Sequence, residues 1–304
     1  MLNWISANYD PRALFWAWGA IALSMIAIHL FERIFPAQKS QSYRSLGFNA
    51  GVTLAYLALV PIATFLPGYA VTAAVHAAHG PWFAFDLPAV VGHTEGWQRA
   101  ALLALFAFVP ILTFDFFYYW FHRLQHASPW LWEQHKLHHT DEAVNVTTSL
   151  RHHWTEEGFR SILIAVPMGI LFNITPVEAG IVTMFTGQWG YLIHANIRLP
   201  LGPFSTVLLG PQAHRIHHSI EPQHKDRNFA AFFPIWDILF RTFYFPKRDE
   251  FPDTGIVDES SRPNAAQVLF SPFIVWWRMT QRQYQQRDVE SQHSPMKPGN
   301  GVAQ

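Results

Sequence analysis

Eight histidines fall into three short motifs whose spacing suits metal binding. The motifs are H-R-L-Q-H (His122 and His126), H-K-L-H-H (His135, His138 and His139) and H-R-I-H-H (His214, His217 and His218). Residues three and four positions apart share one face of a helix, so each motif directs two or three imidazoles toward one point. Neutral imidazole binds iron, zinc and copper. Because a tetrahedral zinc site uses four ligands, this number of histidines predicts two adjacent metal ions.

Other polar residues near the motifs are candidates for the same site. His194 follows an apolar stretch and is a candidate ligand, with helix capping or packing as the alternative. His152 and His153 are adjacent, and neighbouring residues on a helix point about 100° apart, so one of the two is expected to join the site. Asp115 lies two helical turns before the first motif, where it would either bind metal or orient a histidine ring. His224 is assigned to solvent or to the surroundings of the site.

Several function classes lack support in the sequence. Cysteine is absent, which excludes disulfides, thiolate-held zinc and iron–sulfur clusters held by this chain. The zinc-protease signature H-E-x-x-H is missing, as are the serine-hydrolase elbow, the P-loop and the dinucleotide-binding glycine motif. The net charge is zero and no basic stripe stands out, which argues against nucleic acid as a partner.

The composition predicts an integral membrane protein. Of 304 residues, 50% are hydrophobic and only 14% are charged, against roughly 25% charged in soluble domains. Apolar stretches at about 14–31, 47–66 and 100–120 approach the ~20 residues that a spanning helix needs. Two shorter stretches, about 161–172 and 177–193, are separated by N-I-T-P and predict a short helical hairpin. The first stretch is expected to be a retained helix rather than a signal peptide.

The basic residues predict the orientation of the chain in the membrane. Arg33, Lys39 and Arg44 lie between the first two apolar stretches, whereas the loop 67–98 has no lysine or arginine. By the positive-inside rule, the first connection is cytoplasmic, and the third helix returns to deliver His122 to the same side. We therefore expect an all-α protein of the inner or plasma membrane. It would have three to four transmembrane helices, a short helical hairpin and a cytoplasmic helical cap that carries the two-metal site.

This organisation divides the chain into three regions. Residues 1–99 form an N-terminal transmembrane region, and residues 100–246 form the domain that carries the histidines. Residues 247–304 form a C-terminal extension, which is polar from about residue 281 and is expected to be disordered from there.

The ordered motifs resemble those of the fatty acid hydroxylase / sterol desaturase superfamily, membrane-bound di-iron oxygenases defined by H-x-x-x-H, H-x-x-H-H and H-x-x-H-H boxes. The likeness includes H-A-N at His194, R-H-H-W-T-E at 151–156 and W-D-I-L-F-R-T-F at 236–243. It departs from the family at Trp154, where relatives usually have proline, and at Arg241, where they usually have glycine. Neither departure touches a histidine box.

The resemblance implies a set of site residues. His153 and Glu156 match family positions, which favours His153 over His152 as a ligand, and Glu156 joins Asp115 as carboxylate support for catalysis. The expected metal ligands are His122, His126, His135, His138, His139, His153, His194, His214, His217 and His218.

The resemblance also implies the reaction. Two iron ions would use dioxygen to attack an unactivated C–H bond of a lipid that arrives from the bilayer, with hydroxylation, desaturation or ether cleavage as outcomes. The sequence has no flavin, haem or iron–sulfur motif, so a separate reductase with a ferredoxin or a small cytochrome must supply electrons. The alternatives are a zinc-dependent membrane hydrolase that uses the same histidines and a metal carrier or haem protein without enzymatic activity. The sequence does not identify the lipid.

Overall fold

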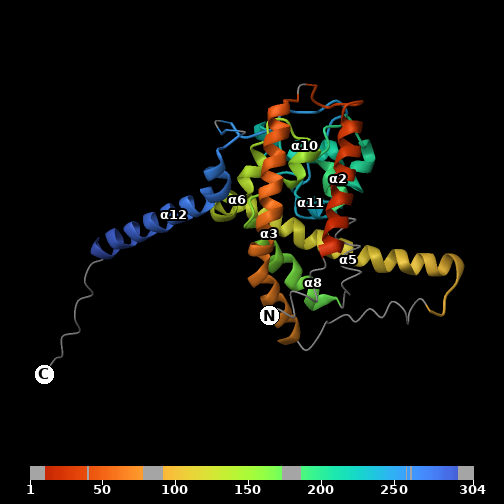
Figure 1. Ribbon diagram of the computed structural model, residues 1–304, viewed down its shortest axis with the longest axis horizontal. Helices are drawn as coiled ribbons and strands as arrows, with labels where there is room; N and C mark the ends of the chain where they lie inside the picture. Colours follow the sequence, from red (N-terminus) through yellow and green to blue (C-terminus); the bar gives the residue numbers. More distant parts are fainter. Residues whose placement is uncertain are drawn as a thin grey trace.

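The chain folds as an assembly of helices, shown in Figure 1 as a computed structural model. The structure describes residues 11–39, 41–77, 92–172, 186–257, 259–260 and 262–293. Within these ranges there is no strand, and extended segments meet only at two isolated bridges. The prediction of an all-α protein is therefore confirmed for the described residues.

Two long helices open the structure. They are α2 (Pro11–Glu32) and α3 (Tyr43–Ala77), which stand upright in Figure 1 and are joined at one end of the body. The segment Tyr43–Ala70 is long and apolar enough to cross a membrane, and among the described residues it alone meets both conditions. Helix α2 contributes a shorter apolar segment, Gly19–Glu32. The expected number of three to four spanning helices stays a prediction.

Helices α5 (Gly96–Ala127) and α6 (Pro129–His139) carry the first two histidine motifs. The expected third apolar helix is longer than its apolar stretch, because α5 continues through both His122 and His126. Ser128 alone separates the two helices, and Pro129 begins α6 at a position where a proline costs no hydrogen bond. The two helices pack against each other, which brings the first two motifs together.

The predicted hairpin packs against α3 and α5 through its first arm. Its first arm is continuous and consists of α7 (Glu156–Arg160), the π-helical turn η2 (Ser161–Ala165) and α8 (Val166–Leu171). Its second arm is helical over 186–193, and the expected turn of the hairpin lies outside the described residues. Gly158 permits the close approach to α3, since a Cβ there would stand 3.0 Å from the carbonyl oxygen of Ala63.

The remaining described elements are five short helical segments and one long helix. The short elements are η1 (Val146–Leu150), η3 (Gly202–Thr206), α10 (Pro211–His217), η4 (Pro222–His224) and α11 (Ile235–Leu239). Helix α12 (Ala265–His293) packs against α6 and projects from the body (Figure 1). The sequence predicts disorder from about residue 281, whereas α12 continues to His293 through glutamine, arginine and glutamate residues that are good helix formers. The rest of the tail for which disorder is expected, 294–304, lies outside the described residues.

Candidate metal centre

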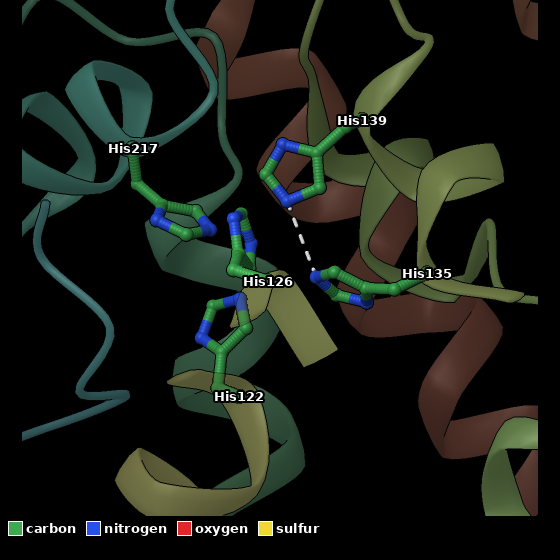
Figure 2. A group of neighbouring side chains, drawn as sticks. All are labelled: His122, His126, His135, His139 and His217. Atoms are coloured by element: carbon green, nitrogen blue, oxygen red, sulfur yellow. Dashed lines mark hydrogen bonds between the residues drawn. The ribbon is translucent and has the colours of Figure 1, made fainter. Parts of the chain in front are cut away.

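Five histidines from α5, α6 and α10 converge on one point (Figure 2). This first group consists of His122, His126, His135, His139 and His217, with ligand atoms that all lie within 4.8 Å of one another. The Nε2 atoms of His135 and His139 are 3.2 Å apart. The Nε2 atoms of His122, His126 and His217 are buried and have no hydrogen-bond partner in the described part of the chain.

A second group of four histidines lies beside the first. It consists of His138, His194, His214 and His218, all buried. Nε2 of His194 lies 3.1 Å from Nε2 of His138 and 2.8 Å from Nε2 of His214. Nε2 of His214 lies 3.3 Å from Nε2 of His218. The same kind of nitrogen from four side chains therefore meets in one small volume.

Each H-x-x-H-H motif divides its histidines between the two groups. His135 and His139, one helical turn apart, belong to the first group, whereas His138 belongs to the second. The third motif does the reverse, since its middle histidine, His217, joins the first group and its outer two join the second. The groups touch where His139 stacks on His218, with ring centroids 4.4 Å apart. Adjacent helical residues point about 100° apart, so a double histidine serves two neighbouring centres.

The distances and the chemistry of both groups fit one metal ion in each. Nitrogens about 2.1 Å from a common ion, in tetrahedral or octahedral arrangement, lie about 3.0–3.4 Å from one another. Without an ion, a buried ring nitrogen that lacks a partner costs about 1–3 kcal/mol, and several such atoms face each other here. Burial lowers the pKa of His135 to about 4 and that of His194 to about 3. Both rings are therefore uncharged near neutral pH, the state that binds metal.

Backbone carbonyls fix the orientation of three of these rings. Nδ1 of His122 donates to Phe229 O (2.7 Å), Nδ1 of His217 to Arg227 O (2.8 Å) and Nδ1 of His194 to Gly190 O (2.6 Å). A proton held on Nδ1 leaves the lone pair of Nε2 free, and this nitrogen faces the other histidines of its group. The sequence did not reveal these acceptors, because any residue type offers a carbonyl.

Two carboxylates contact histidines of the first group. Oε2 of Glu156 lies 3.5 Å from Nδ1 of His135 and 3.1 Å from Nδ1 of His152. Burial raises the pKa of Glu156, but the two imidazoles outweigh it and hold the pKa well below its usual value. Asp226 lies 3.5 Å from Nδ1 of His126. The expected supporting role of Glu156 agrees with this geometry, whereas the contact of Asp226 was not anticipated.

The structure does not bring Asp115 to the histidines. Its two oxygens accept hydrogen bonds from the backbone N–H groups of Ala231, Phe232 and Phe233 at 2.8–3.0 Å. Asp237 holds the preceding residues in the same way, through Phe229 N and Ala230 N. The loop held by these two carboxylates includes Phe229, whose carbonyl orients His122. Asp115 therefore acts on the site through the backbone, and the expectation that it contacts a histidine or a metal is corrected.

The structure places His152, rather than His153, against the two groups. The ring of His153 faces α12, with Nδ1 2.7 Å from Thr155 Oγ1 and Nε2 3.2 Å from Leu269 O. The ring of His152 stacks on that of His138, and its Nε2 lies 3.1 Å from Ser149 O. Residues 151–153 are not helical, so the two neighbouring side chains point to different sides. This differs from the choice that the family pattern favoured.

Two further buried side chains, Arg151 and His224, lie outside the two histidine groups. Arg151 is fully buried and donates to Leu137 O and Thr140 Oγ1 at the end of α6, and to Asn49 Oδ1 of α3. His224 is buried outside both groups, 2.9 Å from Ser219 Oγ and 3.3 Å from Glu250 Oε1. Arg151 fixes the end of α6, where the second motif lies. His224 links Ser219 to Glu250 and so has a structural role.

Comparisons with known proteins agree with this geometry. Residues 107–242 match the family model described as fatty acid hydroxylase. An ornithine lipid hydroxylase of Rhizobium tropici is 30% identical over 273 residues, covering 86% of this chain and 76% of that protein. An alkylglycerol monooxygenase of Danio rerio is 36% identical over 135 residues, covering 44% of this chain and 30% of that protein.

A more distant relative is a very-long-chain aldehyde decarbonylase of Oryza sativa subsp. indica, 28% identical over 145 residues, or 42% of this chain and 21% of that protein. This chain thus matches less than a third of the alkylglycerol monooxygenase and of the decarbonylase. No solved structure matches this chain.

Proposed function

Because this chain belongs to the fatty acid hydroxylase family, we propose that it is a membrane-bound di-iron oxygenase that hydroxylates a C–H bond of a lipid. One observation carries the proposal: nine histidines, eight of them buried and His126 nearly so, form two touching groups, each with ring nitrogens at metal-binding distances. Nitrogen ligands suit redox-active iron as well as zinc. The relatives with lipid-hydroxylating names favour iron and dioxygen over hydrolysis.

In this proposal the two histidine groups bind the metals, and the residues behind them orient the ligands. The first group would hold one iron and the second group the other, while Glu156 and the carbonyls behind the rings keep the ligands oriented. Iron with dioxygen supplies the oxidising chemistry. Eight of the nine rings are buried and His126 is 10% exposed, so the surroundings would keep most bulk water from the metals and limit side reactions.

We propose a membrane lipid as the substrate and a separate protein as the electron donor. The relatives are named for ornithine lipids and alkylglycerols, so the substrate is a lipid with a polar headgroup and long chains. Helix α3 crosses the bilayer in this proposal, together with α2, and the short hairpin enters the membrane without two full crossings. The histidine groups face the cytoplasm, where a ferredoxin or small cytochrome docks.

Isotope labelling with purified protein tests the reaction. Full-length protein is loaded with ferrous iron, given a chemical reductant and a total membrane lipid extract, and exposed to oxygen-isotope-labelled dioxygen. The expected result is a lipid product that carries the label. Label incorporated only from labelled water, with zinc as the activating metal, would establish a hydrolase and overturn the proposal.

The same question can be put to cells. Lipid profiles of cells with the gene, without it, and with His138→Ala are compared by mass spectrometry. The variant is expected to match the cells without the gene, because His138 belongs to the second group. Circular dichroism of the purified variant checks that it is folded. Identical lipids in all three strains would contradict an oxygenase of cellular lipids.

A further inference from the structure

A polar cavity lies between the end of α2 and the start of α3, apart from the histidine groups. Its volume is about 200 Å³, and its polar lining includes His29, Arg33, Gln38, Lys39 and Tyr43. Figure 1 shows that this is the end of the body where the two helices are joined. The cavity has no role in the proposed chemistry.

An apolar cavity continues from the polar one along α2, beside the start of α3. It has a volume of about 250 Å³ and is lined by Met25, Ile26, Leu30 and Leu46, with Thr147 of η1 and His29. His29 and Leu46 line both cavities. The two therefore form one groove, polar at the joined ends of α2 and α3 and apolar farther along, which we call the α2–α3 groove.

The polar end of the groove has two cations without protein partners. Arg33 and Lys39 are exposed and form no ion pair or hydrogen bond through their side chains with any residue that the structure describes. The acid in the same cavity, Glu32, is already engaged: one oxygen accepts from Val146 N and Asn196 N, both at 2.7 Å, and the other lies 3.0 Å from Nδ1 of His29. The free charge of this end is therefore positive.

The position of the groove along α3 matches the layers of a bilayer. The segment suited to crossing a membrane begins at Tyr43, which lines the polar cavity, and it continues past Leu46, which also lines the apolar one. A helix that enters the membrane at Tyr43 places the polar end at headgroup depth and the apolar end beside the hydrocarbon. A free anion would use only the polar end, whereas a lipid fits both.

We propose that the α2–α3 groove binds a membrane phospholipid with an anionic headgroup. The headgroup lies against Arg33 and Lys39, and an acyl chain lies along Met25, Ile26 and Leu30. This proposal does not depend on the metals or on the reaction, since its residues are distinct from the histidine groups.

Such a lipid would stabilise the connection between α2 and α3, which is hydrogen-bonded to the segment that follows His194. Gln38 N donates to Asn196 Oδ1 (2.9 Å), and Ala37 N donates to Asn196 O (3.1 Å). Asn196 lines the polar cavity and lies two residues after His194 of the second group. The occupied groove would thus hold the segment that carries His194 in place.

Retention of lipids by the purified full-length protein tests the proposal. Protein in mild detergent is mixed with equal amounts of phosphatidylglycerol and phosphatidylcholine, passed through gel filtration, and its bound lipids are quantified by mass spectrometry. Phosphatidylglycerol is expected in excess. The double variant Arg33→Gln, Lys39→Gln is expected to bind phosphatidylglycerol about 30-fold more weakly, because it removes two positive charges near the headgroup.

A matched control variant distinguishes binding in the groove from non-specific attraction of the anionic lipid to positive charges. Lys247→Gln with Arg248→Gln removes two exposed positive charges elsewhere and is expected to leave the retention of phosphatidylglycerol unchanged. Equal losses in the two double variants would overturn the proposal.

The apolar end is tested separately. Leu46→Gln in the groove is expected to weaken retention, whereas Leu54→Gln, on the exposed surface of α3 (70% exposed), is not. The headgroup glycerophosphoglycerol, which has no acyl chains, is expected not to displace bound phosphatidylglycerol at equal concentration. Displacement by this compound, or by inorganic phosphate, would show a simple anion site and contradict a lipid groove.

Discussion

The imidazole of His152 stacks on that of His138, with ring centroids 4.3 Å apart and planes 14° from parallel. His138 belongs to the second histidine group, and His152 also contacts Glu156, which lies behind His135 of the first. One side chain outside both groups therefore contacts the ligand framework of each. Its neighbour, His153, instead contacts α12.

Substitution of these two neighbours is expected to have opposite effects on metal binding. His152→Ala should weaken iron affinity by about 10- to 100-fold, the usual effect of removing a residue that orients a ligand. His153→Ala should leave the iron content unchanged, because both ring nitrogens of His153 face partners outside the groups. Iron per chain, measured at limiting iron, checks both; loss of iron in His153→Ala alone would restore the choice that the family pattern favours.

Adjacent residues of α6 are expected to belong to different metal ions. His139→Ala removes a ligand of the first group and His138→Ala one of the second, so each single variant should lose most of one ion. The double variant should lose both. Elemental analysis and the electronic spectrum of the cobalt-substituted protein distinguish the sites, with Lys136→Gln as a folding control on the same helix. Identical spectra of the two single variants would contradict two separate groups.

Asp115→Asn is expected to destabilise the fold more than it alters the metals. The carboxylate accepts three backbone hydrogen bonds, and an amide has one oxygen to offer. The loss should be about 1–3 kcal/mol, the usual range for a buried group left without its partner. Thermal unfolding in detergent measures it, with the exposed Asp249→Asn as control. An unchanged melting temperature would contradict the structural role.

Acid is expected to destabilise the metal-free protein. The pKa of His135 falls from 6.5 to about 4 on folding, and that of His194 to about 3, in both cases because burial disfavours the charged ring. Between these values and 6.5 the unfolded chain binds more protons than the folded chain, so the two rings reduce stability as the pH drops below 6.5, and their own contribution levels off below about 3.

Melting temperatures of the metal-free protein between pH values of about 8 and 4 measure this slope. His194→Gln should reduce the slope, whereas substitution of the exposed His93 by glutamine should leave it unchanged. A melting temperature that does not vary over this range would show that the buried rings do not govern acid stability.

Arg241→Gly is expected to stabilise the protein. Arg241 has a φ of 63°, in the left-handed region that costs other residues about 1–2 kcal/mol and glycine almost nothing. Glycine loses about 0.5–1 kcal/mol of chain entropy, so the net gain should be about 1 kcal/mol or less. Chemical unfolding measures it. A loss of stability would indicate that the arginine side chain contributes more than its backbone strain costs.

The histidine motifs were predictable from the sequence because helical periodicity alone relates residues three and four apart. That rule correctly placed the pairs four apart, His135 with His139 and His214 with His218, but not the pairs three apart, because the middle histidine of each of these motifs belongs to the other group. It failed at His152 and His153, where the backbone is not helical. It also failed at Asp115, whose partners lie more than one hundred residues later in the chain. Helical spacing says which face a residue occupies but not what covers that face.

The division of each H-x-x-H-H motif between two groups also limits how the centre can move. The two histidine groups are joined by the peptide bond between His138 and His139 in α6 and by that between His217 and His218 at the end of α10. As long as both helices and the ring orientations are kept, the distance between the groups changes little. The pair of ions would behave as a rigid unit during turnover, and any movement that admits substrate must occur in the elements around it.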